Sequence, residues 1–594
     1  MKINVNRNIL WVQIFINQLA ELGVKYACIS PGSRSTPLTY VLSKNRKIKS
    51  FINLDERSSA FFALGLAKAS KRPTILVTTS GTAVAELYPA IIEAYQQRTP
   101  LIICTADRPP ELVGTGANQT INQHNIFKNH IRWFRDLGLP SISESGFHHL
   151  QKIAIRAFQI SSFENKGPVH LNFPFRKPLE PRSFTDVVNK KILKIKSQKL
   201  NKNKNLSIQS WPRDKSIAKL ADCLIKYQRG IIIVGPMDYD QQMIRGIKKF
   251  SALVKYPILA DGLSQLRYNS SEKDKNIISN FNSILKSEIF VGKNNPDIIL
   301  QFGRTPTSAV LESFLEGTNA ERYLINLYGD NFDPTRNAKA IIKMDPLFFF
   351  NNIHTYLKKK NLHRNKSTWQ SKFLRAEELS EKIKFRIIER SKFPNESAFI
   401  KEIFSYIPAG SHIFIGNSLP VRDLDSFASN LPKRFVIHFN RGASGIDGVS
   451  STAFGIASQK RPMFLISGDL SLIHDLNSLI IASKYSIPII IVVINNNGGG
   501  IFESLPIAEK FNRFREYFVT PHNLELSDII KSFGISYHLI SNKSELKRQL
   551  INRSIKKFAS VLEIQTNAKK SEELRKKYFS EVQKKINKEF INDN

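Results

Sequence analysis

The sequence predicts an α/β protein with three domains, each built from a parallel sheet flanked by helices. Short runs of β-branched and other apolar residues recur along the chain, each bounded by turn residues and followed by a helical pattern. Continuous apolar runs of this length are typical of strands buried on both faces, as in a parallel sheet covered by helices. Two lysine-rich, polar segments without periodicity, at about 183–211 and 358–367, divide the chain into three units.

The three units each contain at least two of the apolar runs. We expect domains at residues 1–185, 205–360 and 390–594. Because strands and helices alternate over the whole length, every unit is expected to be of the α/β class. In chain order, the predicted strands lie at 74–78, 101–104, 230–235, 297–301, 412–415, 463–466 and 489–494.

The composition excludes several classes of protein. With 594 residues, 42% of them hydrophobic and 23% charged, the chain is neither disordered nor collagen-like. Its cysteines, Cys28, Cys104 and Cys223, are too few and too scattered for a disulfide framework or a four-cysteine zinc site. The first residues have no secretory pattern, and the longest apolar run, 487–494, is too short to span a bilayer. We therefore expect a soluble, cytoplasmic protein without membrane insertion.

The positive charge raises the alternative of a nucleic-acid-binding protein. The formal net charge is +37 at pH 7, and a chain this basic suits a nucleic-acid partner. However, the lysines concentrate in 189–205, in 358–360 and in the tail after Ala568, and they surround no nucleic-acid motif. The tail mixes both signs of charge, which is typical of a solvated helix face. We expect no nucleic-acid partner; retention on heparin and a steep loss of binding with salt would favour the alternative.

Glycine- and serine-rich turns follow the predicted strands of the first and third units. In open α/β sheets, ligands bind beyond the carboxyl ends of the strands, where such turns open the next helix. The middle unit has fewer of these turns. Function is therefore expected in the outer units, at the turns 30–35, 79–82, 105–110, 416–419 and 467–471.

Two turns of the third unit carry a predicted metal and phosphate site. The first, Gly-Asp-Leu-Ser at 468–471, follows a buried strand, so that backbone N–H groups at the next helix start can hold a phosphate. Asp469 supplies the hard oxygen that Mg²⁺ prefers. The second, Asn-Asn-Asn-Gly-Gly at 495–499, lies one helix and one strand later, 26 residues beyond Asp469. The turns thus emerge as neighbours on one sheet edge, where the Asn496 amide oxygen and the Gly498 carbonyl complete the site.

This pair of turns resembles the motif of thiamine diphosphate enzymes, and the spacing disfavours the alternative of two unrelated turns. The cofactor implies a glutamate that hydrogen-bonds its aminopyrimidine ring. Glu56 lies between a short apolar segment and the helical residues 60–67. Burial there raises the pKa of a carboxyl group, as a proton-sharing role requires. The alternative for Glu56 is an ordinary charged helix start, where acids favour the helix dipole.

Further segments extend the resemblance over nearly all of the first and third units, whereas the middle unit matches only in outline. They lie at 30–37, 55–57, 79–82, 106–110, 115–120, 416–419, 440–448, 468–471 and 495–499. By these segments the chain resembles the family of thiamine diphosphate-dependent synthases of menaquinone and phylloquinone biosynthesis. The resemblance implies the thiamine diphosphate-binding fold, with a pyrimidine-binding, a central and a diphosphate-binding domain in this order.

The resemblance also implies a transferase that uses thiamine diphosphate with Mg²⁺ or Mn²⁺. Such an enzyme decarboxylates 2-oxoglutarate and adds the resulting carbanion to isochorismate in a 1,4 fashion. Both substrates are dianions, and arginine binds carboxylates in a fixed fork. Independently of the family, four arginines lie in or beside the turns named above: Arg34, Arg108, Arg422 and Arg441.

Carried over position by position, the resemblance assigns a role to each site residue. Glu56 matches the catalytic glutamate, and the predicted metal ligands are Asp469, Asn496 and Gly498. Ile446 matches an apolar wedge under the cofactor, and for Ile446, Ile501 and Phe502 plain core packing is the alternative. The predicted cofactor-binding residues are Ser444, Ile446, Gly468, Asp469, Leu470, Ser471, Asn496, Gly498 and Ile501. The predicted substrate-binding residues are Arg34, Arg108, Asn118, Gln119, Ser418, Arg422, Arg441 and Phe502.

One position departs from the family pattern. Members usually place a lysine after a strand of the middle domain, where it helps to bind a substrate carboxylate, and here Ala309 occupies that position. Either Arg304 or another basic residue compensates, or the alignment slips in this region. Substrate affinity is the property that this departure affects.

The resemblance further implies a homodimer or homotetramer, in which Glu56 and Asp469 serve each site from different chains. The nearest alternative function is another thiamine diphosphate-dependent 2-oxoacid carboligase or decarboxylase, although the arginines favour dicarboxylate substrates over pyruvate. The middle unit has no G-x-G-x-x-G pattern of the kind that would indicate a dinucleotide site. A purely structural role would make the acid, the metal ligands and the phosphate turn coincidental.

Overall fold

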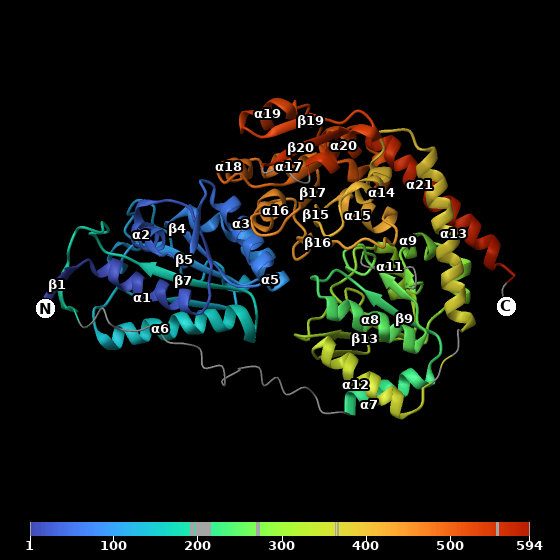
Figure 1. Ribbon diagram of the computed structural model, residues 1–594, viewed down its shortest axis with the longest axis horizontal. Coiled ribbons are helices and arrows are strands. Elements are labelled where there is room, and N and C mark those ends of the chain that lie inside the picture. The colour runs from blue at the N-terminus through green and yellow to red at the C-terminus, as the bar shows by residue number, and fades with distance from the viewer. Residues whose placement is uncertain are drawn as a thin grey trace.

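The computed structural model describes residues 2–190, 197, 215–268, 274–362, 364, 367–553 and 558–592. These residues form three six-stranded parallel sheets and one antiparallel pair, β1 (Lys2–Val5) with β8 (Asp186–Asn189). Figure 1 shows the sheets as three domains, the N-terminal one in blue, the middle one in green and the C-terminal one in orange and red. The predicted α/β class with parallel sheets is confirmed.

The N-terminal sheet has the strand order β3-β2-β4-β5-β7-β6. Its central strands are buried on both faces, as their apolar runs predict. Helices α1, α2 and α6 pack on one face, and α3 and α5 pack on the other. The bounds are β2 (Tyr26–Ile29), β3 (Lys49–Ile52), β4 (Thr74–Thr78), β5 (Leu101–Asp107), β6 (Trp133–Asp136), β7 (Pro168–Pro174), α1 (Arg7–Glu21), α2 (Thr36–Lys44), α3 (Glu56–Ser70), α4 (Thr82–Ala85), α5 (Tyr88–Gln97) and α6 (Glu144–Gln159).

The middle sheet has the strand order β11-β10-β9-β12-β13-β14. Helices α7, α8 and α12 pack on one face, and α9, α10, α11 and α13 pack on the other. The bounds are β9 (Gly230–Val234), β10 (Ile258–Ala260), β11 (Ile277–Ile278), β12 (Ile298–Phe302), β13 (Glu321–Asn326), β14 (Ala340–Lys343), α7 (Lys215–Lys226), α8 (Gln241–Val254), α9 (Phe281–Ile284), α10 (Glu288–Lys293), α11 (Ala309–Gly317), α12 (Pro346–Lys359) and α13 (Thr368–Arg390).

The C-terminal sheet has the strand order β16-β15-β17-β18-β20-β19. Helices α14, α15 and α20 pack on one face, and α16, α18 and α19 pack on the other. The bounds are β15 (His412–Ile415), β16 (Val436–Phe439), β17 (Met463–Gly468), β18 (Ile490–Asn495), β19 (Ser536–Leu539), β20 (Ser560–Gln565), α14 (Glu396–Tyr406), α15 (Leu419–Phe427), α16 (Val449–Ala457), α17 (Asp469–His474), α18 (Ser478–Lys484), α19 (Leu526–Ser532), α20 (Lys543–Arg553) and α21 (Ala568–Phe590).

All seven predicted strands are confirmed, as β4, β5, β9, β12, β15, β17 and β18. Most of the first lysine-rich segment lies outside the described residues. At the second segment, α12 ends at Lys359 and the long helix α13 begins at Thr368, so that a helix fills the interval left between the second and third units. The predicted domain boundaries themselves stay predictions.

Helices α3 and α16 join the N-terminal and C-terminal domains in a close crossing. A Cβ atom built on Gly455 would lie 2.2 Å from the carbonyl oxygen of Phe62, and one built on Gly65 would lie 2.1 Å from that of Thr452. The two backbones therefore touch at a point where any side chain would separate them. One apolar core, which includes Phe62 and Phe454, continues from one domain into the other.

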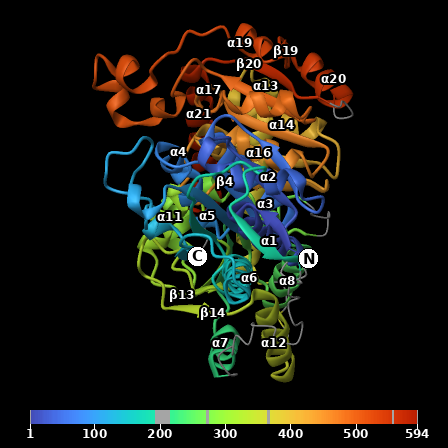
Figure 2. The same ribbon diagram turned by 90° about the vertical axis from the view of Figure 1, so that its left-hand side faces the viewer.

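Helix α21 connects the C-terminal domain to the middle domain. Its side chains Tyr578, Val582, Ile586 and Phe590 belong to the apolar core on the α9–α13 face of the middle sheet. In Figure 1 the helix runs in red along the same edge as α13, and Figure 2 shows the C-terminal domain above the other two. The mixed charges predicted for this tail thus lie on a helix with one buried face.

Two further findings bear on the sequence predictions. Among the residues that the structure describes, no helix has the length and apolar character needed to cross a membrane. Cys28, Cys104 and Cys223 are all free thiols, and the first two are buried. The cytoplasmic location stays a prediction.

Candidate functional site

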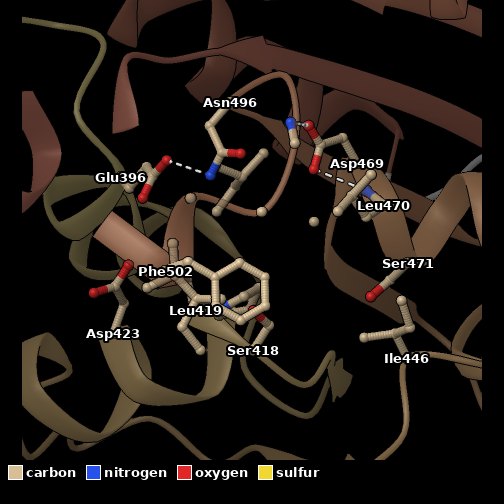
Figure 3. Close-up of a pocket in the computed structure, with 17 residues that line it drawn as sticks. Glu396, Ser418, Leu419, Asp423, Ile446, Asp469, Leu470, Ser471, Asn496 and Phe502 are labelled. Carbon is tan, nitrogen blue, oxygen red and sulfur yellow. Dashed lines mark hydrogen bonds between the residues drawn. The ribbon is translucent and has the colours of Figure 1, made fainter. Parts of the chain in front are cut away.

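A cavity lies at the carboxyl ends of β17 and β18, where the two predicted cofactor turns meet (Figure 3). We call it the C-terminal cavity. The start of α14 and the turn before α15 form its opposite wall. Of the predicted site residues, it brings together Ser418, Ile446, Gly468, Asp469, Leu470, Ser471, Asn496, Gly498, Ile501 and Phe502.

Asp469 is the first residue of α17, and its side chain is buried. Its Oδ2 accepts a hydrogen bond from the Gly498 backbone N–H at 2.9 Å, and its Oδ1 accepts one from the Leu470 N–H at 2.8 Å. The Nε2 of His522 lies 3.3 Å from Oδ2. Burial raises the pKa of the Asp469 carboxyl, although these contacts favour the ionised form. A bound divalent cation would offset the cost of burying this charge.

Asn496 presents an unpaired oxygen near the Asp469 side of the cavity. Its Nδ2 donates to Glu396 Oε1 at 2.9 Å, whereas its Oδ1 is buried without a hydrogen-bond partner. Figure 3 shows the amide nitrogen turned toward Glu396 and the oxygen turned the other way, toward the side of Asp469. A buried acceptor without a hydrogen-bond partner costs folding free energy. A cation bound by Oδ1 would remove that cost.

Gly498 occupies a backbone position that excludes side chains. Its φ is +135°, and a Cβ atom there would lie 2.2 Å from the carbonyl oxygen of Val519. The tight turn positions the Gly498 N–H to donate a hydrogen bond to Asp469.

Within the described part of the chain, no group of three or more His, Cys, Asp or Glu side chains could hold a metal. The predicted set instead has one carboxylate, one amide oxygen and one carbonyl, which fits Mg²⁺ completed by phosphate and water oxygens.

The apolar wall of the cavity contains Ile446, Ile501 and Phe502. Ile446 and Ile501 are half-buried, and Phe502 is 37% exposed. These side chains are therefore not part of a closed core, which was the alternative for them. They lie where an apolar portion of a ligand held at Asp469 would make contact.

The turn before α15 carries Ser418 and leads to Arg422. Ser418 has a φ of +70°, and its carbonyl oxygen accepts a hydrogen bond from Arg422 Nη1 at 2.8 Å. Arg441 Nη1 donates to Asn417 Oδ1 at 3.4 Å, so it lies beside the same turn. Burial and the proximity of Arg441 lower the pKa of Arg422. Ser444, predicted to bind cofactor, has a φ of +65° and does not line the C-terminal cavity.

A second cavity adjoins the first, with which it shares Leu419, Asp423 and Ile501. Arg422 lines this adjoining cavity, which places one predicted substrate residue next to the cofactor turns but outside the C-terminal cavity itself.

Ala309 also lines the adjoining cavity, together with Lys286 and Lys576. Lys286 Nζ lies 4.4 Å from the centroid of the Phe579 ring, and Lys576 lies near enough to Glu572 to influence its carboxyl group. Arg304, the residue considered as a substitute for the usual lysine, lines neither cavity and donates to the Gln96 carbonyl at 2.8 Å. Basic residues other than Arg304 thus surround the position where the family has a lysine.

The remaining predicted residues form a separate group in the N-terminal domain. Arg108 Nη2 donates to the Asn118 carbonyl at 2.8 Å, and its Nη1 contacts Ser80 Oγ. Ser80 Oγ in turn donates to the Gln119 carbonyl at 3.0 Å. The buried Arg34 donates to the Phe175 carbonyl, and its pKa is lowered by burial and by the charge of Arg108. These residues follow β2, β4 and β5, at the carboxyl edge of the N-terminal sheet.

Glu56 belongs to this group by position and does not line the C-terminal cavity. It is half-buried at the first position of α3, which Asp55 caps by accepting from Ser58 N–H at 2.8 Å. Burial raises the pKa of the Glu56 carboxyl, in the direction that the sequence predicts. The neighbouring Arg57 donates to the His474 carbonyl at 2.7 Å. Glu56 therefore lies outside the cavity that contains the predicted metal ligands, although its neighbour contacts the helix that Asp469 begins.

Sequence reasoning missed three polar residues at the C-terminal cavity. Glu396 and Asp423 line it, and His522 lies against Asp469. Asp423 lies four residues beyond the Asn-Ser-Leu turn, so that turn could have indicated it. Glu396 and His522 belong to no motif, and only the packing of α14 and of the loop before α19 brings them to the site.

Family models match most of the chain. A model described as the N-terminal TPP binding domain of thiamine pyrophosphate enzymes matches residues 11–126. A middle domain of thiamine pyrophosphate enzymes matches residues 195–415, and the C-terminal TPP binding domain matches residues 424–564. The N-terminal model thus covers the group around Glu56, and the C-terminal model covers the predicted residues of the C-terminal cavity except Ser418.

Curated relatives match over nearly the full length. The chain is 34% identical over 585 residues to the 2-succinyl-5-enolpyruvyl-6-hydroxy-3-cyclohexene-1-carboxylate synthase of Geobacillus kaustophilus, with 98% of each chain covered. It is 34% identical over 620 residues to the synthase of the same name from Haloquadratum walsbyi, with 98% of this chain and 99% of the relative covered. It is 36% identical over 578 residues to that of Trichodesmium erythraeum, with 94% and 96% covered.

Proposed function

The chain belongs to the family of thiamine pyrophosphate enzymes named 2-succinyl-5-enolpyruvyl-6-hydroxy-3-cyclohexene-1-carboxylate synthases, and on this premise we propose that it catalyses the reaction of that name. It decarboxylates 2-oxoglutarate and transfers the remaining four-carbon unit to isochorismate, a transferase step of menaquinone or phylloquinone biosynthesis. The observation that carries the proposal is the identity of 34% or more over nearly the whole chain. This similarity favours the synthase over another 2-oxoacid carboligase or decarboxylase.

The C-terminal cavity is proposed to hold the diphosphate end of the cofactor and its metal ion. Thiamine diphosphate, when bound, supplies the carbon nucleophile and the electron sink that decarboxylation of a 2-oxoacid requires. Asp469 Oδ, Asn496 Oδ1 and the Gly498 carbonyl are the proposed ligands of Mg²⁺ or Mn²⁺. This assignment is supported by the raised pKa of Asp469 and by the Asn496 Oδ1, which is buried without a hydrogen-bond partner. Ser471 and backbone N–H groups at the start of α17 would hold the diphosphate.

Glu56 is proposed to share a proton with the aminopyrimidine ring of the cofactor. A raised pKa favours the protonated carboxyl group, which can donate a proton to the ring and take it back. The half-buried position of Glu56 supplies that shift. The exposed Asn118 and Gln119 lie beside Arg108, and with Arg34 they form a polar, cationic rim for the dianionic substrates.

The enzyme is proposed to be a homodimer, alone or paired into a tetramer, in which each site joins the N-terminal group of one chain to the C-terminal cavity of the other. Two features support this. Glu56 does not line the C-terminal cavity of its own chain. In addition, Leu54, two residues before Glu56, is 66% exposed, and Leu505, Ile507 and Phe511 beyond the cavity are exposed too. Apolar side chains at both half-sites suit burial against a second copy.

The decisive experiment measures consumption of 2-oxoglutarate by the purified protein with thiamine diphosphate and Mg²⁺, with and without isochorismate. We expect isochorismate-dependent CO₂ release and a product with the mass of the adduct. Cofactor binding without that adduct would overturn the substrate assignment and retain the thiamine enzyme. In that case the surroundings of Ala309 would be the first place to examine.

A further inference from the structure

A buried network of charges connects the C-terminal helix to the proposed metal ligand Asn496. Arg575 on α21 donates from Nε to Asp423 Oδ1 at 2.8 Å and from Nη2 to Asp423 Oδ2 at 2.7 Å. The same Nη2 lies 2.6 Å from Glu396 Oε2. Arg575 is 7% exposed, Asp423 is 2% exposed and Glu396 is 1% exposed. Burial of three charged groups in one place is costly unless they are paired and hydrogen-bonded, as these are.

The other oxygen of Glu396 faces the cavity side of the network. Its Oε1 accepts from Asn496 Nδ2 at 2.9 Å and from Thr566 Oγ at 2.9 Å. Both oxygens of Glu396 are thus acceptors, which an ionised carboxylate satisfies and an amide does not. Since an asparagine amide has one donor end and one acceptor end, the acceptor-only partner determines which end of Asn496 faces Glu396.

We propose that Arg575 and Glu396 are positioning residues that fix the Asn496 amide with its oxygen toward the metal site. The inference rests on the proposed function, because the ion concerned is the Mg²⁺ that accompanies thiamine diphosphate. Arg575 holds Glu396 in its orientation, Glu396 accepts a hydrogen bond from the Asn496 NH₂ group, and Oδ1 is left free for the ion. The tail helix α21 thereby acts on the metal site without touching it.

The first test is Glu396→Gln. Arg575 donates only, so it selects the amide oxygen of the new glutamine and leaves the NH₂ group facing Asn496. Asn496 then rotates to accept that bond, which turns its own NH₂ group toward the metal site, where it cannot serve as a ligand. Calorimetry of Mg²⁺ binding to the full-length protein preloaded with thiamine diphosphate should show affinity at least about tenfold weaker. Affinity within twofold of the wild type would overturn the proposal.

The second test reverses the polarity of the same hydrogen bond. In Glu396→Gln/Asn496→Asp, the glutamine NH₂ group donates to one aspartate oxygen, and the other oxygen faces the ion. We expect Asn496→Asp to strengthen Mg²⁺ binding at least about tenfold in the Glu396→Gln background. In the wild-type background it places two carboxylates against each other and should give no such gain. An equal effect of Asn496→Asp in both backgrounds would overturn the proposal, because the two residues would then act independently.

Glu581→Gln is the matched control. Glu581 lies on the same helix and pairs with Arg386 of α13, away from both cavities. Its Mg²⁺ affinity should stay within twofold of the wild type, and a loss as large as that of Glu396→Gln would assign the effect to helix stability and overturn the proposal. If Glu396→Gln alone unfolds, the double variant is compared with Asn496→Asp alone and should bind Mg²⁺ at least as tightly, so clearly weaker binding by the double variant would overturn the proposal.

The same titrations separate the two proposals. Wild-type protein that binds neither thiamine diphosphate nor Mg²⁺ would overturn the proposed function and this inference together. Wild-type protein that binds both, with variants that fail the expectations above, would overturn the positioning role alone.

Discussion

Glu56 begins helix α3 with a half-buried carboxyl group, and burial raises its pKa. The backbone N–H groups of the helix start act in the opposite direction, since they favour the ionised form. Since burial is the larger influence, the protonated form is favoured more than in an exposed glutamate, which is the property that the proposed role uses. At the residue scale, the chemistry therefore depends on where the helix begins.

Replacing Glu56 by glutamine tests this role. Glutamine keeps the size and the hydrogen-bonding reach but cannot transfer the proton, so Glu56→Gln should lower kcat by about 100-fold or more. Thiamine diphosphate affinity, measured by calorimetry, should change little because the C-terminal cavity is untouched. Glu144→Gln, at the exposed start of helix α6, is the control and should leave turnover unchanged. Turnover equal to the wild type would remove Glu56 from the mechanism.

Single residues were predictable from the sequence where a motif fixes their spacing. Asp469 and Asn496 each follow a strand, and adjacent parallel strands bring their ends to one edge, so their meeting in one cavity follows from the pattern. Glu396 and Arg575 lie on helices far from these turns in the sequence. Their contact depends on how α14 and α21 pack, for which a local pattern carries no information.

At the scale of elements, the crossing of α3 and α16 is the main contact between the N-terminal and C-terminal domains. Gly65 and Gly455 meet there, and each would direct a Cβ atom into the other helix's backbone. The apolar residues around them form one continuous core. Since the domains share a core, we expect them to unfold together.

Gly455→Ala should weaken this crossing. The added methyl group would lie 2.2 Å from the Phe62 carbonyl oxygen, and overpacking of this kind costs about 1–3 kcal/mol of unfolding free energy. Chemical denaturation followed by circular dichroism measures the loss. Gly292→Ala on α10 is the control, because a Cβ atom there meets nothing within 4 Å. It should be neutral or slightly stabilising. Equal stability of the two variants would contradict the close contact.

A buried acid at the same interface predicts a pH dependence. Asp475 accepts from the Ser451 N–H at 2.7 Å and from Ser451 Oγ at 2.8 Å, yet burial raises its pKa to about 7. The folded protein therefore binds a proton that the unfolded chain has released between pH ~4 and ~7. The stability from Asp475 is fully present below pH ~4 and is lost as the pH rises through about 7, a change of roughly 4 kcal/mol.

Asp475→Asn isolates this contribution. The variant removes the titration and adds only an offset that is constant with pH. The unfolding free energy should therefore decrease more between pH 4.5 and pH 8 for the wild type than for the variant. Parallel pH profiles for the two proteins would show that Asp475 is ionised throughout this range.

The strands were the most predictable elements because buried parallel strands need continuous apolar runs, such as the one that forms β18. Helix α13 filled an interval to which the sequence analysis assigned no element. Its amphipathic spacing specifies a helix but not a partner, so neither its contact with α21 nor its place on the middle sheet could be read from the pattern.

The whole molecule contains three similar sheets, and Glu56 lies outside the cavity that contains Asp469 and Asn496. The number of domains was predictable from the alternation of strands and helices and from the lysine-rich segments. Their arrangement was not, because it depends on side chains such as Arg57 and Lys68 that contact another domain across long sequence distances. The position of Glu56 outside that cavity leads to a prediction about subunit exchange.

Two inactive variants should restore activity when mixed. Glu56→Gln lacks the proton-sharing group, and Asp469→Ala lacks the metal ligand. In a two-fold dimer with shared sites, random exchange makes half of the dimers mixed, and each mixed dimer has one intact site. Recovered activity should therefore approach about one quarter of the wild-type value. No recovery, with exchange verified by mass spectrometry, would place both groups in one chain's site.

Helix α21 contributes buried contacts that its lysine-rich composition does not indicate. A stop codon directly after β20 would leave every strand of the three sheets in place. It would nevertheless remove Arg575 from Glu396 and Asp423, and Phe590 from the core of the middle domain. In genetic terms, nonsense and frameshift mutations late in the reading frame should be as severe as missense changes at Asp469, and the lysine-rich tail should tolerate substitution of its outer charges but not its loss.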